Sequence, residues 1–160
     1  MTEDDLRPRS RPIPDRHRDG PGAILVGVDG TTSSLRAAAY AAGLARRQRS
    51  RLVAVYVRTA NTPLLPSTAG ASAATSVMEA QDAVERELRA AIDQRAAALD
   101  IDVQLIVRTG EPYTELVAAA EEVNADAVIV GRSTKMLHRI AGSLAIKLVR
   151  AGRWPVTVVP

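Results

Sequence analysis

The chain has no cysteine and no phenylalanine among its 160 residues. Without cysteine it cannot form a disulfide, a cysteine-based zinc site or a thiolate nucleophile. Its few aromatic residues lie outside the basic clusters, so a platform for stacking bases is missing and nucleic acid is not an expected partner. These residues are Tyr40, Tyr56, Tyr113 and Trp154.

Long apolar runs are absent as well. No stretch reaches the roughly 18 to 20 apolar residues that a membrane helix requires, and the N-terminus lacks the apolar core of a secretory signal. We therefore expect a cytoplasmic protein without a membrane segment.

Two nucleotide motifs, G-x-x-x-x-G-K-[ST] and G-x-G-x-x-G, are also missing from the sequence. Neither an acid nor a nucleophile accompanies His138 in a catalytic pattern, and no metal-ligand spacing is present. No catalytic or metal-binding residue is therefore assigned, and ATP hydrolysis is expected to be slow at most.

Residues 1–21 combine Arg, Asp and Pro with hardly any hydrophobic side chains, which predicts a flexible tail. The tail could dock on an acidic partner, although a solvated extension explains the same composition. Residues 22–160 are long enough for one domain. Five short apolar runs in this part predict the strands Ala23–Val28, Leu52–Val57, Val103–Val107, Ala127–Val130 and Val156–Val159.

Helical patterns separate these strands. One helix is expected from the possible N-caps Thr31 to Ser34 up to the cluster around Arg46, and others over Met78–Ala98, Tyr113–Val123 and Gly142–Ala151. On the first two helices the expected inward residues are Leu35, Ala38, Ala42, Ala45, Val77, Val84, Leu88, Ile92 and Leu99. The segment Arg58 to Ser76 lacks periodicity, which predicts a long loop that is either a functional lid or disordered.

The alternation of strands and helices predicts an α/β fold. We expect a five-stranded, mostly parallel open sheet with helices on both faces, in a Rossmann-like arrangement. In such sheets ligands bind at the carboxyl ends of the strands, where the strand order reverses. The candidate ends are Asp29-Gly30, Val57 and Gly131.

The stretch from Ala127 to Ser143 joins a strand to a helix through a basic loop. No Asp or Glu follows Asp126 anywhere in the chain. Exposed backbone N–H groups and the positive end of a helix favour negative charge, so the loop is a candidate anion site. A solvated basic loop is the alternative interpretation. Its basic residues are Arg132, Lys135, His138 and Arg139.

Three separated segments resemble those of the universal stress protein family. They read VGVDGTTSS, VRTGEPYTELVAAAEEVNADAVIVG and GSLAIKLVRAGRWPVTVVP, and they occur in the family's order between Ala23 and Pro160. The resemblance implies a universal stress protein domain over residues 22–160. It also implies a five-stranded parallel sheet of nucleotide-binding alpha-hydrolase-like architecture, often dimeric through its last strand.

The resemblance further implies a nucleotide site. Asp29 matches the family's Asp after the first strand, and Val57 matches its backbone contact after the second. Gly131 and Gly142-Ser143 match the ends of the family loop Gly, two residues, Gly, nine residues, Gly-Ser or Gly-Thr. The implied nucleotide-binding residues are Asp29, Val57, Gly131, Arg132, Thr134, Lys135, Gly142, Ser143 and Leu144.

The loop departs from the family pattern in two ways. Thr134 replaces the second glycine, and seven residues, Lys135 to Ala141, precede Gly142 instead of nine. A threonine lacks the conformational freedom of glycine and adds a side chain where backbone approaches phosphate. The cations of the loop, with Lys135 among them, offer charge-assisted contacts that compensate for this loss.

Two functions follow from these patterns. One is a stress-response module that binds an adenine nucleotide such as ATP, with Mg²⁺, as a regulatory ligand. The other is a dimeric interaction module that binds no nucleotide. In the second case Asp29 only caps a helix, and Gly131 and Gly142 are only turn residues.

The last strand is the expected dimer interface, formed by Val156, Thr157, Val158 and Val159. Pro155 before it suits an edge strand, and an open apolar edge invites pairing with a second copy around a two-fold axis. A strand covered within one subunit is the alternative. The sequence names no other protein partner.

Overall fold

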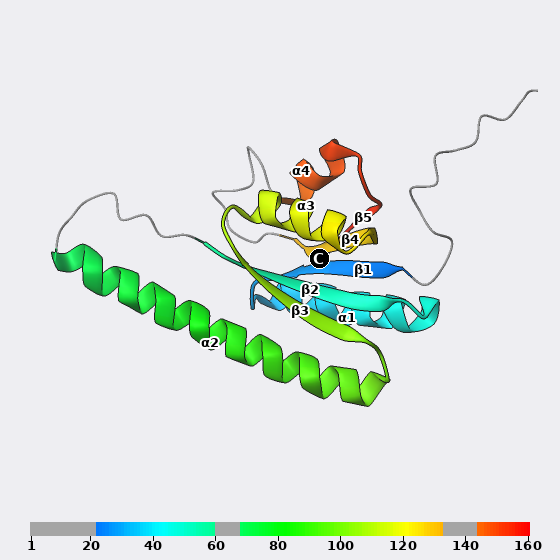
Figure 1. The fold of residues 1–160 in the computed structure, drawn as a ribbon, viewed down its shortest axis with the longest axis horizontal. Coiled ribbons are helices and arrows are strands. Elements are labelled where there is room, and N and C mark those ends of the chain that lie inside the picture. Colours follow the sequence, from blue (N-terminus) through cyan, green and yellow to red (C-terminus); the bar gives the residue numbers. More distant parts are fainter. Residues whose placement is uncertain (1–21, 60–67, 133–143) are drawn as a thin grey trace, which may run out of the picture.

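The computed structural model describes residues 22–59, 68–132 and 144–160, with the backbone alone for residues 68–73. A five-stranded sheet lies between two layers of helices (Figure 1). Strands and helices alternate along the chain in the order β1 (Ala23–Val28), α1 (Thr32–Gln48), β2 (Arg51–Arg58), α2 (Thr68–Leu99), β3 (Val103–Thr109), α3 (Pro112–Glu122), β4 (Ala125–Gly131), α4 (Leu144–Ala151) and β5 (Val156–Val159).

The sheet has the strand order β3-β2-β1-β4-β5, and every neighbouring pair is parallel. The predicted α/β fold is therefore confirmed, with a fully parallel sheet. The central strand β1 lies between β2 and β4, so the strand order reverses beside it. At the edge, β5 begins directly after Pro155, as predicted, because an edge position tolerates the missing N–H of proline.

Both faces of the central strand are buried. In β1, Ala23 and Leu25 pack in the layer of α3 and α4, while Ile24, Val26 and Val28 pack in the layer of α1 and α2. Successive side chains of a strand point to opposite faces, so a strand covered on both sides needs an unbroken apolar run. This burial is why β1 was predictable from the sequence.

The inward face of α1 is the predicted one at Ala38, Ala42 and Ala45, but not at Leu35. Leu35 is 46% exposed, whereas Ser34 is buried. Thr31 is the N-cap of the helix and accepts a hydrogen bond from the Ser34 N–H, while the Ser34 hydroxyl donates to the Thr31 carbonyl at 3.0 Å. These bonds turn Ser34 toward the sheet and Leu35 outward. The buried alanines of the helix are Ala37, Ala41, Ala42 and Ala45.

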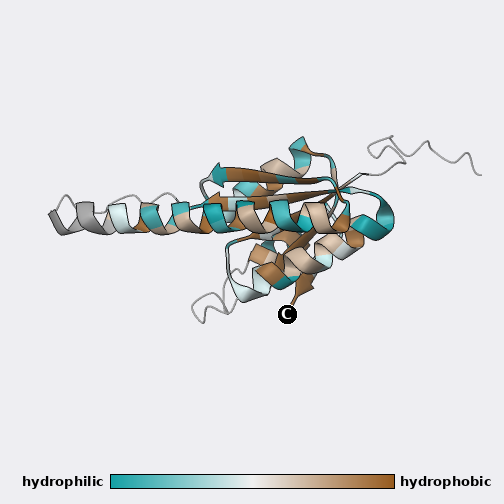
Figure 2. Cartoon of the chain, turned by 90° about the horizontal axis from the view of Figure 1, so that it is seen from below, coloured by the Kyte–Doolittle hydropathy of each residue, from teal (hydrophilic) through white to brown (hydrophobic). Residues whose placement is uncertain are grey.

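Helix α2 starts ten residues before the predicted start at Met78, so the loop expected over Arg58 to Ser76 was wrong from Thr68 onward; residues 60–67 lie outside the described residues. Alanine favours helix strongly, and an apolar stripe is needed only where a helix covers the sheet. Figure 2 shows α2 reaching beyond the sheet. Val77, predicted to face inward, is accordingly 37% exposed, whereas Leu88 in the covering part is 4% exposed. No helix in the described ranges is long and apolar enough to cross a membrane.

Candidate functional site

The structure brings three of the predicted site residues to one edge of the sheet. Asp29 follows β1, Val57 is the next-to-last residue of β2, and Gly131 ends β4. Because these strands are neighbours, their carboxyl ends meet beside the reversal of the strand order, where ligands of such sheets bind. Leu144 is the first residue of α4 and packs in the layer of α3 and α4. The residues Thr134, Lys135, Gly142 and Ser143 lie outside the described residues.

Asp29 is held in a fixed turn but remains exposed. Its Oδ1 accepts hydrogen bonds from the Thr31 N–H at 3.0 Å and the Thr31 hydroxyl at 2.6 Å. Its own N–H donates to the Ser34 hydroxyl at 3.2 Å. The N-cap itself is Thr31, so Asp29 supports the cap rather than providing it. A structural role and ligand contact are therefore compatible at Asp29.

Gly131 is required by close packing. A Cβ atom at this position would lie 2.6 Å from the Ser33 carbonyl carbon and 2.7 Å from the Ser34 nitrogen. These are backbone atoms of the first turn of α1, so they cannot swing away as a flexible side chain would. At the next residue, the Arg132 N–H donates to the Val159 carbonyl at 2.7 Å, while its side chain is exposed. Both residues thus anchor the end of β4.

The end of β2 extends past the end of β1. The β1–β2 pairing stops at Val28 opposite Tyr56, whereas β2 continues to Arg58 alongside β3. The peptide of Val57 therefore lies at the edge, beyond the last residue of β1. Burial is the largest cause that raises the pKa of the neighbouring Tyr56, against the lowering effect of the Arg58 cation.

Sequence reasoning missed the contacts that fasten α2 to this edge. Arg58 forms ion pairs with Asp82 and with Glu85, the latter at 3.0 Å. Gln81 donates to the Thr59 carbonyl and hydroxyl, both at 3.2 Å. A cation directly after an apolar strand was the available signal. Its acidic partner Asp82 lies 24 residues later in the chain, so no local pattern identified the pair.

A second contact holds α3 against α4. Glu111 is the N-cap of α3 and accepts hydrogen bonds from the Thr114 N–H at 2.8 Å and from the Thr114 hydroxyl at 3.0 Å. Lys147 of α4 pairs with Glu111 at 3.3 Å and lies 5.7 Å from the centre of the Tyr113 ring. Burial acts to raise the pKa of Glu111, but the hydrogen bonds from Thr114 and Lys147 outweigh it, and the pKa is lowered.

This lowered pKa predicts a small acid sensitivity. Because the pKa of Glu111 is lower in the folded state, its contribution is present above the pKa of the unfolded chain and is lost as the pH falls through the folded pKa. On acidification, the free energy of unfolding should fall less in Glu111→Gln than in the wild type. The difference should be under about 1 kcal/mol, because the pair of Glu111 and Lys147 is exposed. Urea unfolding at neutral and acidic pH measures the difference. Glu87→Gln, on an exposed position of α2, should behave as the wild type.

The fold and the place of this edge define a doubly wound, fully parallel α/β protein. The sequence model of the universal stress protein family matches residues 22–160, and the chain belongs to this family. No protein of curated function matches the sequence.

Solved structures of this family share the fold. The universal stress protein UspA from Lactobacillus plantarum superposes with a TM-score of 0.69 at 23% identity, over 88% of this chain and 98% of that one. A universal stress protein in complex with cAMP gives 0.60 at 24% identity, over 86% and 95%. One from Archaeoglobus fulgidus in complex with dAMP gives 0.52 at 19% identity, over 87% and 98%.

Proposed function

We propose that this stress-response module binds an adenine nucleotide, such as ATP, as a regulatory ligand at the carboxyl edge of β1, β2 and β4. The observation that carries the proposal is Asp29, an exposed carboxylate fixed in a turn beside the reversal of the strand order. A carboxylate accepts hydrogen bonds only, which suits the hydroxyl groups of a nucleoside. Two structural neighbours, which were solved in complex with cAMP and dAMP, support this ligand class.

The other residues would take complementary roles. The Val57 peptide at the edge suits hydrogen bonding to the adenine base, and the exposed Arg132 side chain suits a phosphate group. The described residues contain no group of three or more His, Asp or Glu that could hold a metal ion. Mg²⁺ would therefore bind together with the phosphates. The further loop residues that we assign to the phosphates are Thr134, Lys135, Gly142, Ser143 and Leu144.

A second candidate function is a dimeric interaction module without a nucleotide. Its support is that Gly131 packs on α1 and that the Arg132 N–H bonds to β5, so the start of the loop serves the fold. The replacement of the second glycine by Thr134 points the same way. In both functions we infer a cytoplasmic homodimer that pairs through β5. Catalytic turnover of a nucleotide is not its main purpose.

Purified wild-type protein distinguishes the two candidates. Native mass spectrometry should detect a retained adenine nucleotide. A ligand at about a hundred times its Kd adds roughly 2.7 kcal/mol to the free energy of unfolding, which raises the Tm by several degrees. Absence of bound nucleotide, together with an unchanged Tm in millimolar ATP, would reject the nucleotide proposal and favour the interaction module.

The variant Asp29→Asn tests the site itself. Asparagine retains an oxygen that accepts from Thr31, so the turn is kept, but the negative charge is lost. We expect the Kd for ATP, measured by calorimetry, to rise about tenfold, which corresponds to roughly 1.4 kcal/mol. Asp102→Asn makes the same change at an exposed position of the opposite edge and should leave the Kd unchanged. Equal affinities of both variants would place the ligand elsewhere.

A further inference from the structure

The outward side of α1 carries arginine side chains but no aspartate or glutamate. No Asp or Glu occurs between Gly30 and Met78. The arginines of α1 and of the turn after it are all exposed, and within the described ranges none of them forms an ion pair. They are Arg36, Arg46, Arg47 and Arg49.

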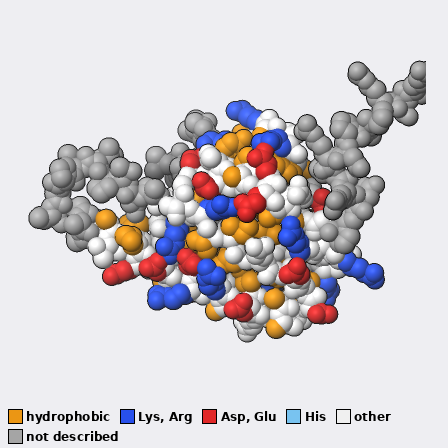
Figure 3. All heavy atoms as spheres, in the orientation of Figure 1, with side chains coloured by type: hydrophobic (Ala, Val, Ile, Leu, Met, Phe, Trp, Pro, Cys, Tyr) orange, Lys and Arg blue, Asp and Glu red, His pale blue; other side chains and the backbone are white. Residues whose placement is uncertain are grey.

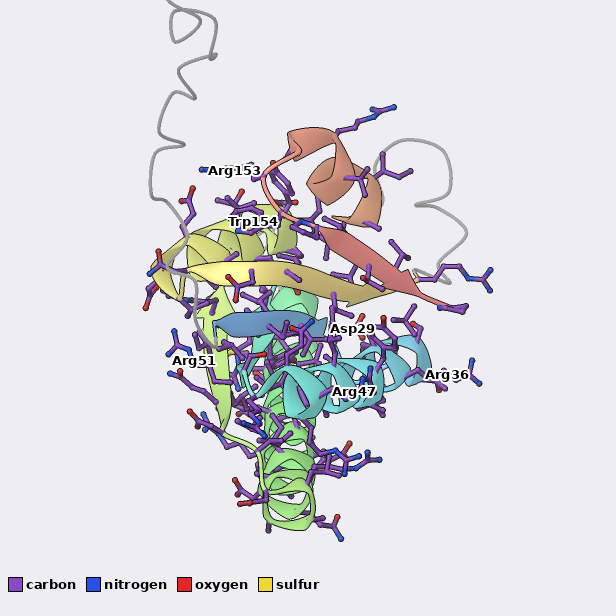
Figure 4. The ribbon with its side chains drawn as sticks, turned by 90° about the vertical axis from the view of Figure 1, so that its right-hand side faces the viewer. Asp29, Arg36, Arg47, Arg51, Arg153 and Trp154 are labelled. Carbon is purple, nitrogen blue, oxygen red and sulfur yellow. The ribbon has the colours of Figure 1, made fainter. Side chains whose placement is uncertain are left out.

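Several cations elsewhere are compensated. Arg108 pairs with Glu122, Lys147 with Glu111 and Arg153 with Glu121. Figure 3 shows acidic and basic side chains side by side on one face of the molecule. In Figure 4, Arg153 and Arg36 lie on opposite sides of the sheet, and Arg36 points away from it. The acids paired on α3 are thus already occupied, which makes the α3 surface of a second copy a poor counterpart for α1.

Positive charge on α1 is combined with exposed apolar groups. Arg36, Tyr40, Gly43 and Arg47 follow one another at spacings of four, three and four residues, which places them on one side of the helix. Tyr40 on this side is 45% exposed, and Leu35, on an adjoining side of the helix, is 46% exposed. A Cβ atom on Gly43 would lie 3.3 Å from Nη1 of Arg47, so this guanidinium lies close to Gly43. We call Arg36, Tyr40, Gly43 and Arg47 the α1 stripe.

We propose that the α1 stripe docks an acidic peptide segment of another protein. Guanidinium groups match the geometry of carboxylates, and the exposed Tyr40 offers contact to an apolar side chain between the acids. A single tyrosine does not make the row of stacked rings that single-stranded nucleic acid uses. The alanine face of α1 is buried against the sheet, so the helix has too little free apolar surface to insert into a membrane. The proposal does not depend on nucleotide binding.

Two of the four arginines lie close to carboxylates, so mutating them would test the docking proposal less clearly. Arg46 and Arg49 line a hollow at the amino edge of the sheet together with Asp100 and Asp102. These carboxylates offset part of the positive charge there. Arg36 and Arg47 have no acid beside them in α1 and are the residues to change.

The test uses the full chain and a fluorescein-labelled peptide of Glu-Glu-Leu and Glu-Glu-Tyr repeats, followed by fluorescence anisotropy. Arg36→Glu combined with Arg47→Glu should raise the Kd by about tenfold to a hundredfold. Tyr40→Ala should weaken binding severalfold through lost apolar contact. Arg86→Glu with Arg95→Glu makes the same charge change on exposed positions of α2 and should alter the Kd by less than about threefold at physiological salt.

Three results would overturn the proposal. Equal losses in the two double variants would mean that net charge alone attracts the peptide. A Glu-Glu-Ser peptide that binds as tightly would exclude the apolar contact. Tighter binding of an oligothymidylate of the same charge, lost in the same α1 variant, would make the stripe a nucleic-acid surface. Circular dichroism of each variant confirms that differences in Kd are not caused by unfolding.

Discussion

Gly131→Ala is expected to destabilise the protein by about 3 kcal/mol, the upper range for a side chain added to a packed interior. The new Cβ would lie 2.6 Å from the Ser33 carbonyl carbon and 2.7 Å from the Ser34 nitrogen. Since both are backbone atoms, β4 and α1 must separate to accommodate the methyl group. Differential scanning calorimetry should show a decrease in Tm of roughly 5 to 10 °C for a domain of this size.

The same chemical change at Gly43 is the matched control, with the opposite sign. Gly43 lies within α1, and its added Cβ would meet only Nη1 of Arg47, the end of a flexible side chain, at 3.3 Å. Alanine is favoured over glycine in a helix by about 0.5 to 1 kcal/mol, so the Tm should rise slightly. If Gly131→Ala proves as stable as Gly43→Ala, the close approach of β4 to α1 is incorrect.

This packing also affects how nucleotide binding should be tested. A shift of the first turn of α1 would move Thr31 and, through its hydrogen bonds, the carboxylate of Asp29. Gly131→Ala would then weaken binding even if Gly131 never touches the ligand. A loss of affinity in this variant therefore cannot identify a phosphate-binding glycine. Asp29→Asn, which keeps the turn, is the more specific variant.

The strands β1, β2 and β4 were predictable because burial on both faces leaves a continuous apolar run in the sequence, and the partly buried edge strands β3 and β5 are also mostly apolar. The start of α2 was not predictable in this way. Its first part does not cover the sheet, so Val77 and Met78 remain exposed and no apolar stripe forms. In the first turn of α1, the hydrogen-bonded Ser34 is buried instead of the predicted Leu35, and hydropathy alone does not detect such hydrogen bonds.

The candidate site was predictable only in its position. Parallel strands place their carboxyl ends at one edge, so Asp29, Val57 and Gly131 could be assigned to it from the sequence. The contact of Gly131 with Ser33 joins the end of β4 to the first turn of α1, and no local pattern encodes it. The pairing of Arg58 with Asp82 likewise depends on how α2 crosses the sheet.

Val158→Pro is expected to convert the proposed homodimer into monomers. The Val128 N–H donates to the Pro155 carbonyl and the Arg132 N–H to the Val159 carbonyl, so the backbone groups of Pro155, Thr157 and Val159 face β4. Those of Val158 then point to the open edge, because successive residues of a strand face alternate neighbours. Proline at this position removes an outward N–H and leaves the bonds to β4 in place. Light scattering coupled to size-exclusion chromatography measures the change in mass.

Two further variants separate an edge-strand interface from the alternatives. Thr157→Pro removes an N–H that faces β4, so it should lower the Tm more than Val158→Pro does. Val149→Asp changes a 57% exposed residue of α4 and leaves the strand edge intact. If Val158→Pro remains dimeric while Val149→Asp becomes monomeric, the copies associate through α4. If only Val158→Pro dissociates, main-chain pairing along β5 holds the dimer, because that variant alone blocks the edge.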